Sequence, residues 1–179
     1  MANGSPEIDL SVGDLQAVTG FAVTCATTAL AIFEEVRPDD GRPRTAIEVA
    51  RAFADGGRRT KAIRDGAWAA HRAAQEARDD EQAAASAAAR AAGHACGAAY
   101  LHPLAKATQV GHILGSAACA APARELVAGD DPAVAAEHIA QAVALAPAVV
   151  VDVLRRFPTA PSGGGRVGEL IRELDSALR

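Results

Sequence analysis

Two histidines on neighbouring predicted helices have the types and spacing best suited to chemistry in this chain of 179 residues. His94 follows Arg90 by four positions and His112 follows Thr108 by four, and residues four apart share one face of a helix. Imidazole titrates close to neutral pH and commonly acts as a general acid or base. His94 and His112 are therefore the candidate catalytic residues.

The two histidines are predicted to meet across a helical hairpin. If the chain turns at residues 101–102, His94 lies level with Gln109, and His112 is three residues, or about 4.5 Å, further along the axis. In the same scheme His71 lies level with Ala88, about 9 Å of axial rise from His94. Space for the two rings is predicted from three glycines: Gly93, Gly97 and Gly111.

Further polar and aromatic side chains are candidates for holding a ligand. Arg42 and Arg44 could clamp a carboxylate or a phosphate, although their turn, residues 37–44, equally suits a salt-bridged connector. Trp68 suits a core anchor as well as a ligand contact. The predicted ligand-binding set is Arg42, Arg44, Trp68, His71, Arg90, His102, Thr108 and Gln109.

The same histidines also suit a purely structural role, filling polar gaps inside a bundle. Cysteines and carboxylates do not lie at metal-ligand spacing beside them, so neither a metal nor a cofactor is predicted. Phosphate-binding glycine loops and the G-x-S-x-G, H-E-x-x-H and C-x-x-C signatures are missing from the sequence. Whether the protein is an enzyme is thus left open.

Composition predicts an all-α fold. The chain holds 46 alanines but only four Phe, one Trp and one Tyr. Alanine has the highest helix propensity and little volume, so its helices must approach closely to bury a core. We expect one domain, residues 1–179, a bundle of about seven helices built from Ala-rich antiparallel hairpins.

Turn and capping residues divide the chain. Residues 1–10 are expected to be a flexible leader, and residues 158–165 a Pro/Gly loop before a C-terminal helix. Thr45 and Glu48 form a capping-box pattern, and Pro103 and Pro132 each suit a first helical position. The predicted helices cover about 14–36, 45–56, 58–78, 81–100, 103–127, 132–147, 147 onward and 166–178.

Charge and targeting signals narrow the function classes. The net charge of −4 argues against a nucleic-acid partner. Neither a signal peptide nor a run of about 18 uncharged apolar residues is predicted, with residues 83–99 the closest, so we expect a cytoplasmic protein without a membrane partner. The three cysteines (Cys25, Cys96, Cys119) suit reduced, buried thiols.

Five segments of the chain match one known family: residues 37–48, 67–71, 91–95, 100–115 and 163–170. They resemble the bacterial putative immunity proteins of the Imm-five-like type. The resemblance covers roughly residues 14–178 and implies a small cytoplasmic helical protein that neutralises a partner, with no catalytic residues to carry over. Gly111 stands where a larger, basic residue is expected before His112.

Three functions stay open. The first is an immunity-like protein that binds and neutralises a protein toxin, for which the acidic balance suits a basic target. The second is a small-molecule-binding protein or a cofactor-free enzyme (a lyase, cyclase, isomerase or resistance protein of secondary metabolism) using a His94/His112 pocket. The third is a scaffold or oligomerising bundle, including a homodimer.

Overall fold

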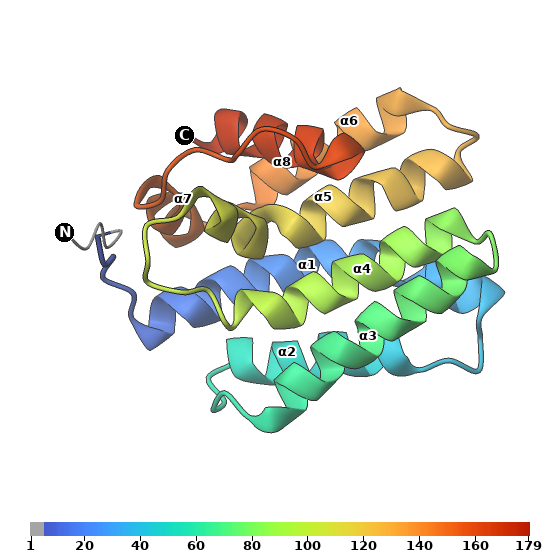
Figure 1. Cartoon of the computed structure of the whole chain (residues 1–179), viewed down its shortest axis with the longest axis horizontal. Coiled ribbons are helices and arrows are strands. Elements are labelled where there is room, and N and C mark those ends of the chain that lie inside the picture. The colour runs from blue at the N-terminus through green and yellow to red at the C-terminus, as the bar shows by residue number, and fades with distance from the viewer. Residues whose placement is uncertain (1–5) are drawn as a thin grey trace.

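The structure is a computed structural model that describes residues 6–179. Within these residues it contains eight α-helices, one for each predicted range and close to the expected count of about seven, and one short 3-10 helix (Figure 1). The all-α prediction is confirmed. The helices are α1 (Val12–Val36), α2 (Arg42–Ala54), α3 (Lys61–Asp79), α4 (Ala83–Ala98), η1 (Ala107–Gln109), α5 (Val110–Val127), α6 (Pro132–Leu145), α7 (Ala148–Arg155) and α8 (Gly165–Leu178).

Helix α4 lies between α3 and α5, as Figure 1 shows, and packs against both. Its buried face consists of Ala, Ser86 and Cys96, whose small volumes let the neighbouring backbones approach. The hydroxyl of Ser86 donates a hydrogen bond to the Ala74 carbonyl of α3 (2.7 Å), and that of Ser116 in α5 donates to the Ala91 carbonyl of α4 (2.9 Å). Two buried hydroxyls thus tie the three helices together.

Helix α1 runs through the centre of the bundle and contacts α2, α4, α5 and α7. Residues 15–33 are uncharged, so the prediction that no such run exists was wrong. By length and composition α1 could also cross a membrane, with a mean hydropathy of 1.6 over its most apolar stretch. In this fold that stretch forms the core, where Val18, Ala26 and Phe33 are fully buried.

Two predicted helix starts are wrong. Helix α2 begins at Arg42 with Gly41 as its N-cap, so the predicted capping box at Thr45 lies inside the helix. The predicted helix start at Pro103 is an irregular segment instead, because residues 6–8 pair with it. The Ile8 amide donates to the Pro103 carbonyl (2.6 Å) and the Ala105 amide to the Pro6 carbonyl (3.0 Å).

Other boundaries follow the sequence closely. Asp131 caps α6 through the Ala133 amide (3.0 Å), with Pro132 at the first helical position. The valine-rich segment after Pro147 is the helix α7, as predicted. Of the predicted leader, residues 1–5 lie outside the described residues, and residues 6–8 pair with the α4–α5 connection rather than hanging loose.

The three cysteines are free thiols and are buried, as predicted. Burial raises the pKa of Cys25 and of Cys96 to about 12 and that of Cys119 to about 11. Thiols with such high pKa values are protonated at neutral pH and react slowly. They act as small apolar side chains in the Ala-rich core.

Candidate functional site

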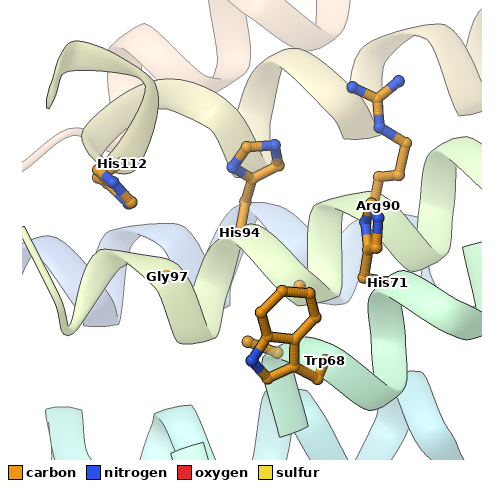
Figure 2. A pocket seen from close by; sticks show the side chains of 8 residues that line it. Trp68, His71, Arg90, His94, Gly97 and His112 are labelled. Atoms are coloured by element: carbon orange, nitrogen blue, oxygen red, sulfur yellow. The ribbon is translucent and has the colours of Figure 1, made fainter. Parts of the chain in front are cut away.

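The predicted histidines line an open pocket of about 410 Å³ at the seam of α3, α4 and α5 (Figure 2). We call it the imidazole pocket. Three residues come from α3, four from α4 and one from α5: Ala67, Trp68 and His71; Arg90, Gly93, His94 and Gly97; and His112.

His94 and His112 are held by a reciprocal contact with glycine. The ring of His94 lies against Gly115 of α5, where an added Cβ would be 2.5 Å from its Nδ1. The ring of His112 lies against Gly97 of α4, where an added Cβ would be 3.4 Å from its Nδ1. Each imidazole thus occupies the space that a missing side chain leaves on the opposite helix, and both reach the same pocket (Figure 2).

The glycine prediction was right for two positions and wrong for one. Gly93 and Gly97 line the pocket, but a Cβ at Gly111 would meet nothing within 4 Å, so Gly111 does not make the space. The glycine that does so, Gly115, was missed. The α4–α5 connection is longer than the tight turn assumed, which places His94 level with Gly115 rather than with Gln109.

Burial keeps both histidines in the neutral form. Desolvation, helped by the positive charge of Arg90, lowers the pKa of His94 to about 4. Burial also lowers the pKa of His112, against the opposing effect of a hydrogen bond with the Gly97 backbone. A neutral imidazole offers one hydrogen-bond donor and one acceptor and adds no charge to the pocket.

The side chains of Arg90 and Trp68 are both exposed at the pocket. Within residues 6–179 Arg90 makes no hydrogen bond or ion pair, and its side chain is exposed. Trp68 is 62% exposed and meets His71 edge to face, with ring centroids 6.4 Å apart. The interpretation of Trp68 as a core anchor was therefore wrong, and its indole stands free to contact a ligand or partner.

His71 of α3 also lines the imidazole pocket. An added Cβ at Gly93 would be 3.9 Å from the His71 amide nitrogen, which puts the α3–α4 contact near these two residues. His71 and Arg90 also line a second, smaller hollow of about 210 Å³ towards Arg78 and Ser86. The polar lining thus continues along the seam of α3 and α4.

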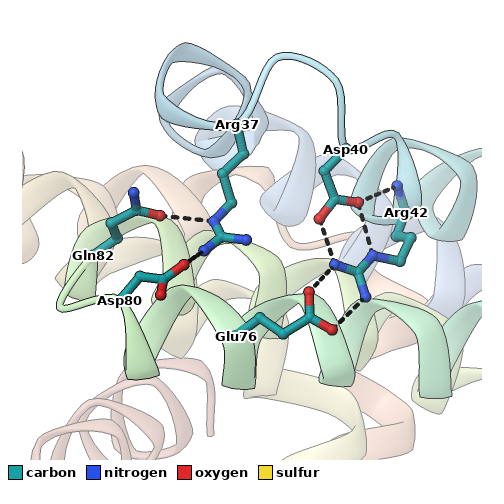
Figure 3. Close-up of polar contacts among 6 residues, drawn as sticks. All are labelled: Arg37, Asp40, Arg42, Glu76, Asp80 and Gln82. Atoms are coloured by element: carbon teal, nitrogen blue, oxygen red, sulfur yellow. Dashed lines mark hydrogen bonds and ion pairs between the residues drawn. The ribbon is translucent and has the colours of Figure 1, made fainter.

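The remaining predicted ligand-binding residues lie outside the imidazole pocket. Arg42 is paired with Asp40 and Glu76 (Figure 3). Arg44 is paired with Glu34 (2.7 Å), and both sets of pairs support the interpretation of their turn as a salt-bridged connector. His102, Thr108 and Gln109 belong to the α4–α5 connection. There the Gln109 amide oxygen accepts a hydrogen bond from the His102 backbone (2.8 Å), and Thr108 is exposed.

One further histidine, which the sequence did not single out, is buried inside the fold. His138 in α6 is 3% exposed, and neither of its ring nitrogens has a partner in the described part of the chain. Burial lowers its pKa to about 4, helped by the charge of Arg124. Nothing in its sequence context signals this, because the burial comes from packing of α6 in the assembled fold.

The site does not offer a ligand set for a metal. Among residues 6–179 no three His, Cys, Asp or Glu side chains gather closely enough to hold a metal ion. The chemistry available in the pocket is that of one guanidinium, three imidazoles and one indole on a floor of Ala and Gly.

Comparison with known proteins identifies the family. The family described as Imm-5 like putative immunity protein matches residues 10–138, which cover α1 to α5 and the first half of α6 and include the entire imidazole pocket. No curated protein and no solved structure matches the chain. Since the matched residues make up well over half of its length, the chain belongs to the Imm-5 like putative immunity protein family.

Proposed function

We propose that this protein is an immunity protein that binds a basic protein toxin in the cytoplasm and neutralises it. Membership of an immunity family supports a protein partner in general. The observation that carries the choice of a basic partner is the concentration of acidic side chains at one end of the bundle.

Three stretches lie at the same end of the bundle, on the right in Figure 1, which we call the acidic end: residues 34–41, 79–82 and 128–131. Arg37 joins the first two through its ion pair with Asp80 (Figure 3). Together the stretches hold nine Asp or Glu residues and one Arg, which leaves 17 Lys or Arg against 13 Asp or Glu elsewhere. Arg37, Arg42 and Arg44 form ion pairs with three of these nine carboxylates, those of Asp80, Asp40 and Glu34. Among residues 6–179 the other six have no ion pair, so this end keeps an excess of negative charge: Glu35, Asp39, Asp79, Glu81, Asp130 and Asp131.

The negative charge at this end comes from side chains and not from helix dipoles. Helices α1, α3 and α5 end here, but α2, α4 and α6 begin here, so negative carboxyl ends and positive amino ends offset one another. Repulsion among like charges destabilises a fold, so a surface of this kind is better explained by a partner than by stability.

Apolar surface accompanies the charge. A hollow of about 290 Å³, lined by Ile32, Arg124, Val127, Ala128 and Val134, lies beside the 128–131 turn, and Val127 is 62% exposed. Protein interfaces combine an apolar centre with a charged rim that steers association. The partner that fits this end is a basic protein whose contact surface has an apolar residue at its centre.

The test is co-expression with the protein encoded by the neighbouring gene, followed by size-exclusion chromatography and a growth assay. The wild-type chain should form a stable 1:1 or 2:2 complex and restore growth. The triple variant Glu35→Lys, Glu81→Lys, Asp130→Lys should lose both. A matched variant with the same charge change away from this end, Glu48→Lys, Asp55→Lys, Glu173→Lys, should keep both.

Two results would contradict the proposal. One is the absence of any complex with the wild-type chain. The other is an equal loss in the two triple variants, which would make net charge rather than the acidic end responsible.

A further inference from the structure

The charge of the imidazole pocket is unbalanced. Arg90 is its one permanent charge, and no Asp or Glu lines it. The influence of Arg90 reaches across the α4–α5 contact, because its charge lowers the pKa of both His94 and Cys119. An unpaired guanidinium binds a carboxylate through two parallel hydrogen bonds and holds it in one plane.

Because its buried imidazoles are neutral, the pocket suits a ligand with a single negative charge. His94 and His112 are neutral at pH 7, because burial lowers the pKa of each. They can donate to or accept from a ligand but do not neutralise further charge. A monoanion matches this lining better than a dianion such as hydrogenphosphate.

The walls suit a flat apolar group. Gly93, Gly97 and Ala67 contribute almost no side-chain bulk, and the indole of Trp68 stands at the mouth of the pocket (Figure 2). Aromatic faces pair with other rings in offset or edge-to-face geometry. A volume of about 410 Å³ is that of a small-molecule site, in which apolar walls dominate and a few polar groups fix the orientation.

From this geometry we propose that the imidazole pocket binds a small aromatic carboxylate. The carboxylate lies on Arg90 and the ring lies over Gly93 and Gly97 beside Trp68. His94 and His112 hydrogen-bond to polar substituents of the ring. This site is separate from the acidic end, so it does not depend on the proposed toxin partner.

The chain carries its own reporter for this site, because Trp68 is its only tryptophan. Purified protein is titrated with benzoate, benzamide and inorganic phosphate, and the fluorescence of Trp68 is followed. Benzoate should give a saturable change with a dissociation constant of about 1 mM or less. Benzamide, which keeps the shape and loses the charge, and phosphate, which lacks the ring, should each bind at least about tenfold more weakly.

Three variants separate the pocket from unspecific binding. Arg90→Gln should weaken benzoate about tenfold, and Ala67→Leu should block the pocket by filling it. Arg72→Gln, an exposed arginine of α3 that does not line the pocket, should bind benzoate like the wild type. Circular dichroism of each variant checks that the fold is intact.

The proposal is overturned if benzoate gives no saturable signal, or if benzamide or phosphate binds as tightly as benzoate. It is also overturned if Arg72→Gln loses as much affinity as Arg90→Gln. None of these outcomes bears on the toxin complex, which is measured with a different partner and different variants.

Discussion

The imidazole of His94 fills the place on α5 where a side chain at Gly115 would project, within 2.5 Å of its Nδ1. The Gly115→Ala variant should therefore overpack this contact. An alanine normally stabilises a helix relative to glycine, but the clash outweighs that gain, and we expect a net loss of about 1–2 kcal/mol in the free energy of unfolding. Urea denaturation measures it.

The control for this variant lies one turn earlier on the same helix. Gly111→Ala meets nothing within 4 Å and should stabilise the protein by about 0.5–1 kcal/mol. In a double-mutant cycle, Gly115→Ala should become stabilising once His94 is alanine. A Gly115→Ala variant as stable as Gly111→Ala would show that the ring of His94 does not occupy the space next to Gly115.

Acid should destabilise the protein through its buried histidines. The pKa of His138 is about 4 when folded and about 6.5 when unfolded, so the unfolded chain binds the proton first as the pH falls. Stability is therefore retained above pH 6.5 and falls towards pH 4, by on the order of 3 kcal/mol for His138. His94 shifts in the same direction.

Replacing His138 with leucine tests this. Both ring nitrogens are buried without partners in the described residues, so His138→Leu should raise the unfolding free energy at pH 7 by about 1 kcal/mol. The same variant should lose less stability than the wild type between pH 6.5 and 4.5. An identical pH dependence in variant and wild type would mean that His138 is not the group responsible.

Backbone strain at the acidic end offers a way to separate stability from binding. Glu81 and Asp130, in two of its turns, have left-handed φ angles of 60° and 62°, which non-glycine residues rarely adopt. Glu81→Gly should stabilise the protein by about 1 kcal/mol and weaken the toxin complex. Glu81→Gln, which removes the charge and keeps the strain, should weaken the complex equally without stabilising the fold.

These two readouts are thermal unfolding of the free protein and the dissociation constant of its complex. If Glu81→Gly binds the toxin as tightly as the wild type, the carboxylate at this turn takes no part in the interface. If the free variant is no more stable, its left-handed backbone carries no strain.

Most helix boundaries could be predicted because local signals agreed with the final packing. Asp131 and Pro132 start α6, and Pro147 separates α6 from α7, just as capping and proline chemistry require. The start of α5 could not be predicted in this way. Whether the segment around Pro103 is helical depends on its backbone hydrogen bonds with residues 6–8, almost a hundred residues earlier.

The site could be predicted in part for a similar reason. Helical periodicity placed His94 and Arg90 on one face, and both line the pocket. The burial of Gly115 and His138 depends on the register and packing between helices. The periodicity of residues within one helix carries no information on either. The axial offset of three residues between His94 and His112 was predicted correctly in size but not in direction. His94 was predicted to lie level with Gln109, three residues before His112, and it lies level with Gly115, three residues after it.

The most direct test of the central claim, a basic toxin bound at the acidic end, is hydrogen exchange of the purified complex against the free protein. We expect slower exchange in residues 34–41, 79–82 and 128–131 and unchanged exchange in α8 (Gly165–Leu178). Protection confined to α8 or to the α2–α3 connection, with the three acidic stretches exchanging as in the free protein, would contradict it.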